Sequence, residues 1–148
     1  MRLTPLLLLL ALFACAPDQS PPASWSHYGG DPGLSHYSEA TQIDTANLGQ
    51  LVPLWTYHTG DADTANFSQI QCNPIVVDGI LYGATPQMRL FAADAATGVE
   101  KWVFDPRDAS LDKHGGWYKH NMINVRGLAH WKGDGETRLF FTAGSLTY

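Results

Sequence analysis

The chain has 148 residues, of which 45% are hydrophobic and 16% charged, and its formal net charge at pH 7 is −5. This balance weighs against disorder for the body of the chain, because disordered chains lack hydrophobic residues. The negative charge and the absence of a long basic run make nucleic acid a poor candidate partner.

Residues 1–15 have the pattern of a secretory signal. Met1-Arg2 gives a short positive start, and residues 6–13 form an apolar run that is too short to span a bilayer. The run ends in Leu-Phe-Ala-Cys, which resembles the lipobox of bacterial lipoproteins, so that Cys15 would become the acylated N-terminus. An ordinary signal peptide with an incidental cysteine is the alternative.

Residues 16–24 are predicted to form a flexible polar tether. In lipoproteins that resemble this chain, a residue such as Ala16 after the acylated cysteine usually permits export to the outer membrane. Acylation of Cys15 leaves Cys72 as the only other thiol, so no intrachain disulfide is expected. These features predict a periplasmic protein that is held to a membrane, the outer one, by a lipid anchor.

The next predicted elements lead into a sheet. Thr45 is placed to cap a helical turn in residues 45–51. Residues 51–59 are predicted to be extended and to end in a strand that contains Trp55. The region between residues 25 and 43 carries Gly-Gly, Asp-Pro and Pro-Gly pairs, which mark turns.

Residues 74–104 predict four short antiparallel strands. Two runs of β-branched and aromatic residues meet at Asp78-Gly79, which is a strong hairpin signal. Thr97-Gly98 can make a second tight turn, because glycine readily adopts a positive φ. Asp94 is placed to accept hydrogen bonds from the N–H groups of that turn.

A long loop and a second strand pair complete the chain. Residues 105–121 interrupt the strand pattern, and such loops often build the mouth of a site, although an inert insertion is nearly as plausible. Residues 126–131 and 138–144 resemble the earlier strand pair and flank a glycine-rich turn at residues 132–136. The second unit stops within its expected third strand.

Trp55 and Trp102 each close a strand and lie 47 residues apart, which falls in the period of roughly 40–50 residues of four-stranded propeller blades. Each indole can pack flat against a neighbouring blade. One sheet of four short strands cannot bury both of its faces, so such units stack in a ring. The predicted fold is therefore all-β and comprises about one and a half to two blades of a longer protein's propeller.

The pattern Ala-x-Asp-x-x-Thr-Gly-x-x-x-Trp at residues 92–102 resembles the tryptophan-docking motif of quinoproteins that hold pyrroloquinoline quinone (PQQ). Residues 28–61, 70–106 and 124–131 are similar to the membrane-type glucose dehydrogenase branch, and the likeness covers residues 25–148. It implies the N-terminal part of an eight-bladed propeller with PQQ and calcium on its axis, a downstream aspartate as base and the metal as a Lewis acid. No catalytic or metal-binding segment of the family falls within this chain.

The resemblance carries over two early cofactor contacts. Gln71 stands where the family has an acidic residue, three positions before Pro74; an amide can hydrogen-bond the quinone but brings no charge. The alternative is a strand residue bonded to backbone. Arg126 matches an arginine that contacts PQQ, and a guanidinium suits a tricarboxylate through paired hydrogen bonds. The alternative for Arg126 is a surface ion pair.

His120 is a third candidate contact. In methanol-dehydrogenase relatives, a vicinal disulfide five and six residues before the arginine covers one face of the cofactor, whereas this chain has His120 and Asn121 there. Glucose-type relatives have a histidine nearby, although a structural or exposed histidine is the alternative. The other histidines lack zinc-site spacing, and no P-loop, dinucleotide or serine-hydrolase motif is present.

Two functions remain open on these grounds. The first is a PQQ-dependent dehydrogenase that oxidises a sugar or alcohol in the periplasm and passes electrons to a quinone or cytochrome. The second is a non-catalytic outer-membrane lipoprotein whose propeller binds protein partners. In either case, the 148 residues alone are expected to be inactive, because the propeller is incomplete.

Overall fold

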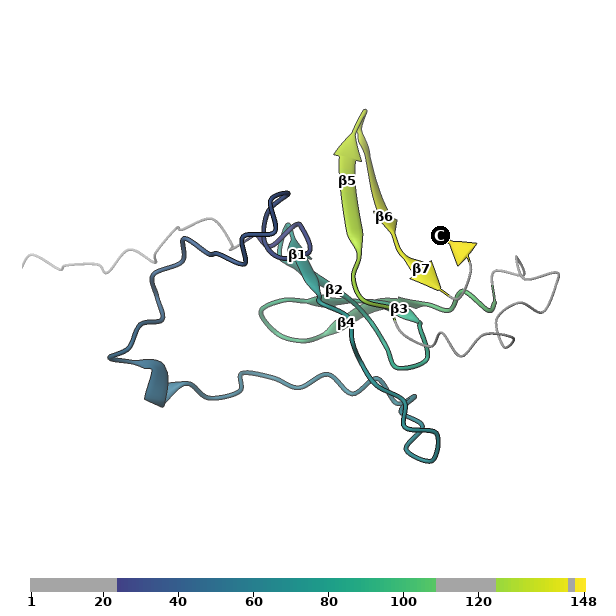
Figure 1. The fold of residues 1–148 in the computed structure, drawn as a ribbon, viewed down its shortest axis with the longest axis horizontal. Helices are drawn as coiled ribbons and strands as arrows, with labels where there is room; N and C mark the ends of the chain where they lie inside the picture. The colour runs from purple at the N-terminus through teal and green to yellow at the C-terminus, as the bar shows by residue number, and fades with distance from the viewer. Residues whose placement is uncertain (1–23, 109–124, 144–145) are drawn as a thin grey trace, which may run out of the picture.

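A computed structural model describes residues 24–108, 125–143 and 146–148, and β-strands are its main regular elements (Figure 1). One sheet holds four consecutive antiparallel strands in the order β1 (Ile75–Val77), β2 (Ile80–Ala84), β3 (Leu90–Asp94) and β4 (Glu100–Phe104). The prediction of four antiparallel strands within residues 74–104 is therefore confirmed.

The tight turns of this sheet depend on residues with positive φ. Asp78 (φ 50°) and Gly79 (φ 76°) occupy both central positions of the β1–β2 turn, as the favoured two-residue hairpin turn requires. Gly98 (φ 72°) lies in the β3–β4 turn. There the Asp94 carboxylate accepts hydrogen bonds from the N–H (3.0 Å) and hydroxyl (2.9 Å) of Thr97, which lower the pKa of Asp94. The turn chemistry expected from the sequence is confirmed.

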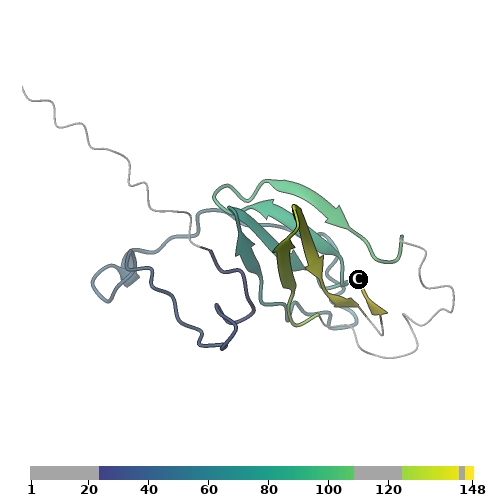
Figure 2. The same ribbon diagram turned by 90° about the horizontal axis from the view of Figure 1, so that it is seen from above.

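The second unit contains two short hairpins, made by β5 (Ala129–Gly133) with β6 (Glu136–Phe140) and by β7 (Thr142–Ala143) with β8 (Leu146–Thr147). The β5–β6 hairpin overlies the four-stranded sheet in the view of Figure 2 and rises away from it in the view of Figure 1. The strand expected at residues 126–131 begins only at Ala129. Residues before it instead contact the first unit, since the Asn73 N–H donates to the Arg126 carbonyl oxygen (3.1 Å).

The two units share one hydrophobic core. The first unit contributes Ile75, Val77, Ala84, Met88 and Leu90, and the second contributes Val125, Leu128, Phe141 and Ala143. At its edge, the Phe104 and Phe141 rings meet edge to face with centroids 6.2 Å apart. Neither unit buries its apolar face alone, which is the property expected of stacked blades.

Residues 51–59 differ from the expected strand. They are extended, and Trp55, Tyr57 and Thr59 alternate as half-buried residues with exposed neighbours, as on a strand with one packed face. Within the described parts of the chain, however, no backbone hydrogen bond pairs residues 52–59 with a neighbouring segment. A regular strand requires such a partner, so this segment is held instead by contacts that involve side chains.

The predicted helical turn is present, but its capping residue differs. A single turn of 3₁₀-helix, η1, spans Leu48–Gln50 and has Asn47 at its N-terminal boundary. Thr45 does not cap it. The Asp44 carboxylate instead accepts hydrogen bonds from the backbone N–H of Ala46 (2.8 Å) and Asn47 (3.1 Å), because it precedes those free donors at the spacing of an Asx turn.

Candidate functional site

Trp55 joins the extended segment to the four-stranded sheet. Its indole Nε1 donates a hydrogen bond to the Ala95 carbonyl oxygen (3.1 Å). The ring also lies against Gly98, where an added Cβ would come within 2.6 Å of Trp55 Cδ2. Gly98 therefore provides both the turn conformation and the space for the indole. The predicted packing of Trp55 against the next unit is present in the structure.

Trp102 does not make the corresponding contact within the described residues. It lies on β4 opposite Ala92, and its ring centroid is 6.0 Å from that of Tyr82 in the same sheet. Trp102 remains 40% exposed. The other residues of β4, the edge strand of the sheet, are exposed as well. The predicted packing on a neighbouring blade is not seen for Trp102. The second unit instead meets β4 at Phe104, whose ring lies against those of Phe141 and Tyr148.

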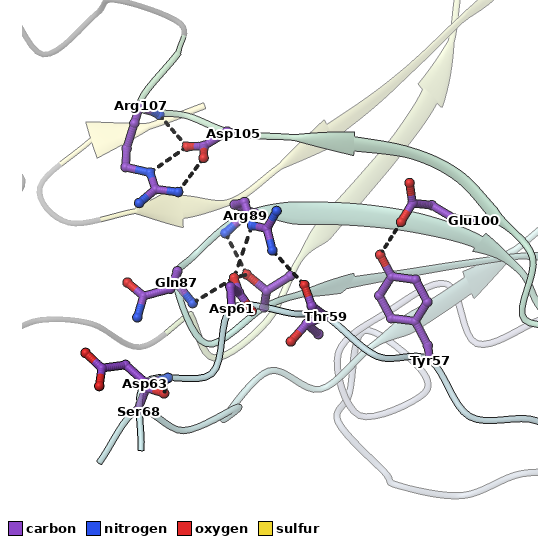
Figure 3. Close-up of polar contacts among 11 residues, drawn as sticks. Tyr57, Thr59, Asp61, Asp63, Ser68, Gln87, Arg89, Glu100, Asp105 and Arg107 are labelled. Carbon is purple, nitrogen blue, oxygen red and sulfur yellow. Dashed lines mark hydrogen bonds and ion pairs between the residues drawn. The ribbon is translucent and has the colours of Figure 1, made fainter. Parts of the chain in front are cut away.

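A polar network, which the sequence analysis did not identify, holds the end of the same segment. The Arg89 side chain donates from Nε to Asp61 Oδ2 (3.1 Å) and from Nη2 to the Thr59 carbonyl oxygen (2.7 Å). The Thr85 hydroxyl and the Gln87 N–H also donate to Asp61 Oδ2 (Figure 3). The network joins residues 59–61 to the β2–β3 turn.

The environment of Asp61 keeps its carboxylate ionised. Its side chain is 11% exposed and that of Arg89 is 25% exposed. Burial opposes ionisation of Asp61, but the hydrogen bonds of Thr85, Thr59 and Arg89 outweigh it and lower the pKa of the carboxyl. The Asp61–Arg89 ion pair is consequently intact at neutral pH.

Tyr57 provides a third attachment between Trp55 and Asp61. Its ring stacks on Phe91 with centroids 4.5 Å apart, and its hydroxyl donates to the Glu100 carboxylate (2.6 Å; Figure 3). Burial, together with the hydrogen bond to Glu100, raises the pKa of Tyr57 to about 12. The hydroxyl therefore stays protonated at neutral pH. The side chains of Trp55, Tyr57 and Asp61 together fix the segment on the sheet.

Arg126 lies in the wall of a pocket of about 370 Å³. The other lining residues are Tyr28, Gly127, Leu128, Ala129, Phe140, Phe141, Thr142 and Thr147. Arg126 itself is exposed and lies between Val125 and Leu128, each only 4% exposed. Among the described residues, no hydrogen bond or ion pair involves its guanidinium, so the surface ion pair considered above is not observed there.

The structure brings the backbone segments of Gln71 and Arg126 together. Asn73, two residues after Gln71, donates its N–H to the Arg126 carbonyl oxygen (3.1 Å). The half-buried Gln71 side chain donates through Nε2 to Gln69 Oε1 (3.0 Å). This contact differs from the backbone bond that was the structural alternative for Gln71. His120 and Cys15 lie outside the described residues.

The described part of the chain offers no metal centre, because no group of three His, Cys, Asp or Glu side chains gathers there in a suitable arrangement. The calcium ligands that the family resemblance implies were expected outside this chain. Cys72 is a free, half-buried thiol whose pKa is raised by burial. No helix in the described ranges has the length and apolar character needed to cross a membrane.

A four-stranded antiparallel sheet that shares its core with the start of a second unit, and that receives an indole from the preceding segment, defines part of a β-propeller. Residues 25–146 match the family described as "PQQ: Glucose/ethanol/alcohol dehydrogenase, beta-propeller domain". The chain belongs to this family of quinoprotein dehydrogenases. The predicted fold class, an all-β part of a quinoprotein propeller, is confirmed.

Individual relatives agree with the family. The chain is 33% identical over 116 residues to quinoprotein glucose dehydrogenase of Escherichia coli (strain K12), covering 76% of this chain and 14% of that protein. It is 38% identical over 86 residues to the dehydrogenase subunit of alcohol dehydrogenase (quinone) of Gluconobacter oxydans (strain 621H), covering 58% and 11%. The crystal structure of quinohemoprotein alcohol dehydrogenase from Comamonas testosteroni superposes with a TM-score of 0.65 at 28% identity, covering 84% of this chain and 17% of that one. The chain thus spans a small part of each relative.

Proposed function

We propose that the complete protein is a PQQ-dependent dehydrogenase that oxidises a sugar or an alcohol and passes the electrons to a quinone or cytochrome acceptor. The observation that carries this proposal is Arg126 in the wall of a pocket, with a guanidinium that has no partner among the described residues. It lies in a chain that belongs to a family of PQQ dehydrogenases. The substrate classes follow from the matched relatives, which are named as glucose and alcohol dehydrogenases.

The residues present fit a cofactor that carries carboxylates. A guanidinium binds a carboxylate through two parallel, charge-assisted hydrogen bonds, and Arg126 has no competing carboxylate among the described residues. Gln71, on the adjacent segment, can add an uncharged hydrogen bond. PQQ, when bound, supplies the redox chemistry, whereas Arg126 and Gln71 would hold and orient it. His120 as a contact and calcium as a second cofactor stay predictions.

Arg126→Ala in the complete protein is expected to weaken PQQ binding by about 10–100-fold, the loss that corresponds to charge-assisted hydrogen bonds of roughly 1.5–3 kcal/mol. Arg126→Lys should give an intermediate loss, since it keeps the charge but not the paired geometry. The dissociation constant is measured by titrating the apoprotein with PQQ in calcium-containing buffer.

Arg138→Ala is the matched control. Arg138 is 59% exposed and pairs with Glu136 on β6, so its removal should leave PQQ affinity within about twofold. Equal affinity of the Arg126→Ala variant and the parent would remove Arg126 from the cofactor site. A complete protein that binds no PQQ at all would favour the non-catalytic scaffold instead.

We also propose that the protein is periplasmic and anchored through a lipid on Cys15. Cys15→Ser should abolish incorporation of radioactive palmitate and move the protein from the membrane fraction to the soluble periplasmic fraction, because a single serine cannot be acylated in this way. Cys72→Ser, which removes the other thiol, should label like the parent. Continued labelling of the Cys15→Ser variant would contradict the lipid anchor.

A further inference from the structure

Tyr28 lies in the wall of the same pocket as Arg126, although the two are far apart in the sequence. Its ring rests on the residue that follows the arginine: a Cβ added to Gly127 would come 2.6 Å from Tyr28 Cδ2 and 3.4 Å from Cε2. Only glycine leaves room for this contact. The aromatic ring is therefore in direct contact with the backbone that carries Arg126.

The segment that bears Tyr28 is anchored and folded, although Tyr28 itself is 38% exposed. Trp25 exchanges two backbone hydrogen bonds with Val76 of β1 (2.8 and 3.0 Å), and its indole packs on Gly30. The Asp31 carboxylate accepts the Gly33 N–H (2.6 Å). The first of these contacts ties the segment to the first unit, and Tyr28 then reaches the second.

Arg126 is held through its neighbours rather than through its own side chain. Val125 and Leu128 are buried in the shared core, and the Arg126 carbonyl oxygen accepts the Asn73 N–H (3.1 Å). The Tyr28 ring lies against Gly127, the next residue along the chain. With the backbone fixed in this way, Arg126 lines the pocket in the apoprotein, and its guanidinium has no partner among the described residues.

We propose that Tyr28 is a positioning residue that fixes the Arg126–Gly127 backbone and thereby holds the Arg126 guanidinium at the pocket for a carboxylate of the cofactor. The ligand's identity rests on the proposed function, whereas the contact is a property of the apoprotein. The aromatic ring carries this role, because the Tyr28 hydroxyl makes no hydrogen bond within the described residues. Preorganisation of this kind raises affinity, since the loop need not be ordered on binding.

A double-mutant cycle in the complete protein tests whether Tyr28 acts through Arg126. PQQ is titrated into the parent, Tyr28→Ala, Arg126→Ala and the double variant. We expect Tyr28→Ala to weaken binding about tenfold with Arg126 present and by less than about twofold without it. Equal losses in both backgrounds would indicate a general structural role and overturn the proposal, as would no loss in either.

Further variants separate the ring from other effects. Tyr28→Phe should bind PQQ like the parent, because it keeps the ring, and Tyr37→Ala, which removes a 71% exposed tyrosine of the same segment, should also match the parent. Gly127→Ala should lower the affinity for PQQ about as much as Tyr28→Ala does, because its new Cβ would displace the Tyr28 ring. A normal affinity of Gly127→Ala would contradict the proposed contact even if Tyr28→Ala fails to fold.

Amide hydrogen exchange in the apoprotein tests the same contact without any ligand. The Asn73 N–H, which donates to Arg126, should exchange about tenfold faster in Tyr28→Ala than in the parent, because local opening exposes it. The Thr85 N–H, bonded to Arg89 (2.8 Å), should be unchanged. Unchanged exchange at Asn73 would overturn the proposal. Faster exchange in a protein that binds no PQQ would instead contradict the proposed function and leave the positioning role of Tyr28 intact.

Discussion

Gly98→Ala is expected to destabilise the complete protein by about 2–4 kcal/mol, as a sum of backbone strain and overpacking. The residue has a φ of 72°, and its new Cβ would lie 2.6 Å from Trp55 Cδ2. The indole cannot retreat without losing its hydrogen bond to the Ala95 carbonyl oxygen. The free energy of unfolding in urea measures this effect.

Gly60→Ala separates the two contributions. Gly60 has nearly the same φ, 70°, but nothing lies within 4 Å of its added Cβ. This variant should therefore lose only the strain energy of about 1–2 kcal/mol. Equal losses for Gly98→Ala and Gly60→Ala would show that the Trp55 contact contributes nothing, which would contradict the account of the joint between the units.

Asp61→Asn is expected to destabilise the complete protein by about 2–3 kcal/mol, because it leaves the Arg89 guanidinium without its carboxylate in a partly buried site. The expected loss is smaller than for a fully buried pair, since Arg89 is 25% exposed. Asparagine preserves the side chain's size, so the loss reports the charge and its hydrogen bonds. Urea unfolding at pH 7 measures it.

The pH dependence of stability has a defined sign. The folded-state pKa of Asp61 is lowered from its ordinary value of 3.8. Its contribution is therefore present above pH 3.8 and is lost as the pH falls through the lower, folded-state pKa. Below that pKa, the parent and the Asp61→Asn variant should converge in stability. If the difference in stability between the parent and Asp61→Asn persisted unchanged below that pKa, it would contradict the contribution ascribed to the ionised Asp61 carboxylate.

Asp78→Asn is the matched control for the charge. Asp78 pairs with Lys132 at 3.0 Å, but the two side chains are 74% and 63% exposed. Asparagine also tolerates the positive φ of this turn position. The loss should stay within about 0.5 kcal/mol. Similar losses at Asp61 and Asp78 would show that partial burial of the Asp61–Arg89 pair has no consequence.

The sequence allowed the four-stranded sheet to be predicted because its turns are determined locally. Asp78-Gly79 and Thr97-Gly98 place positive-φ residues between short runs of β-forming residues, and both turns formed where expected. The 47-residue spacing of Trp55 and Trp102 likewise indicated a joint between units, and the structure shows that joint for Trp55. Such features can be predicted because they depend on a few neighbouring residues or on a repeated sequence pattern.

The contacts that organise the candidate site could not be predicted in this way. Asp61 and Arg89 are 28 residues apart and follow no chemical motif, so only the folded chain reveals their pairing. The contact of Tyr28 with Gly127 is equally invisible in the sequence. Residues 51–59 show the limit of pattern analysis, because alternation predicts a packed face but not the presence of a strand partner. Arg126 was found through the family resemblance, not through its own spacing.

The most direct test of the account is a crystal structure of the complete protein with PQQ bound. We expect a carboxylate oxygen of the cofactor within about 2.7–3.2 Å of an Arg126 guanidinium nitrogen, with the Tyr28 ring still resting on Gly127. A structure in which PQQ binds elsewhere and Arg126 pairs with a protein carboxylate would contradict it.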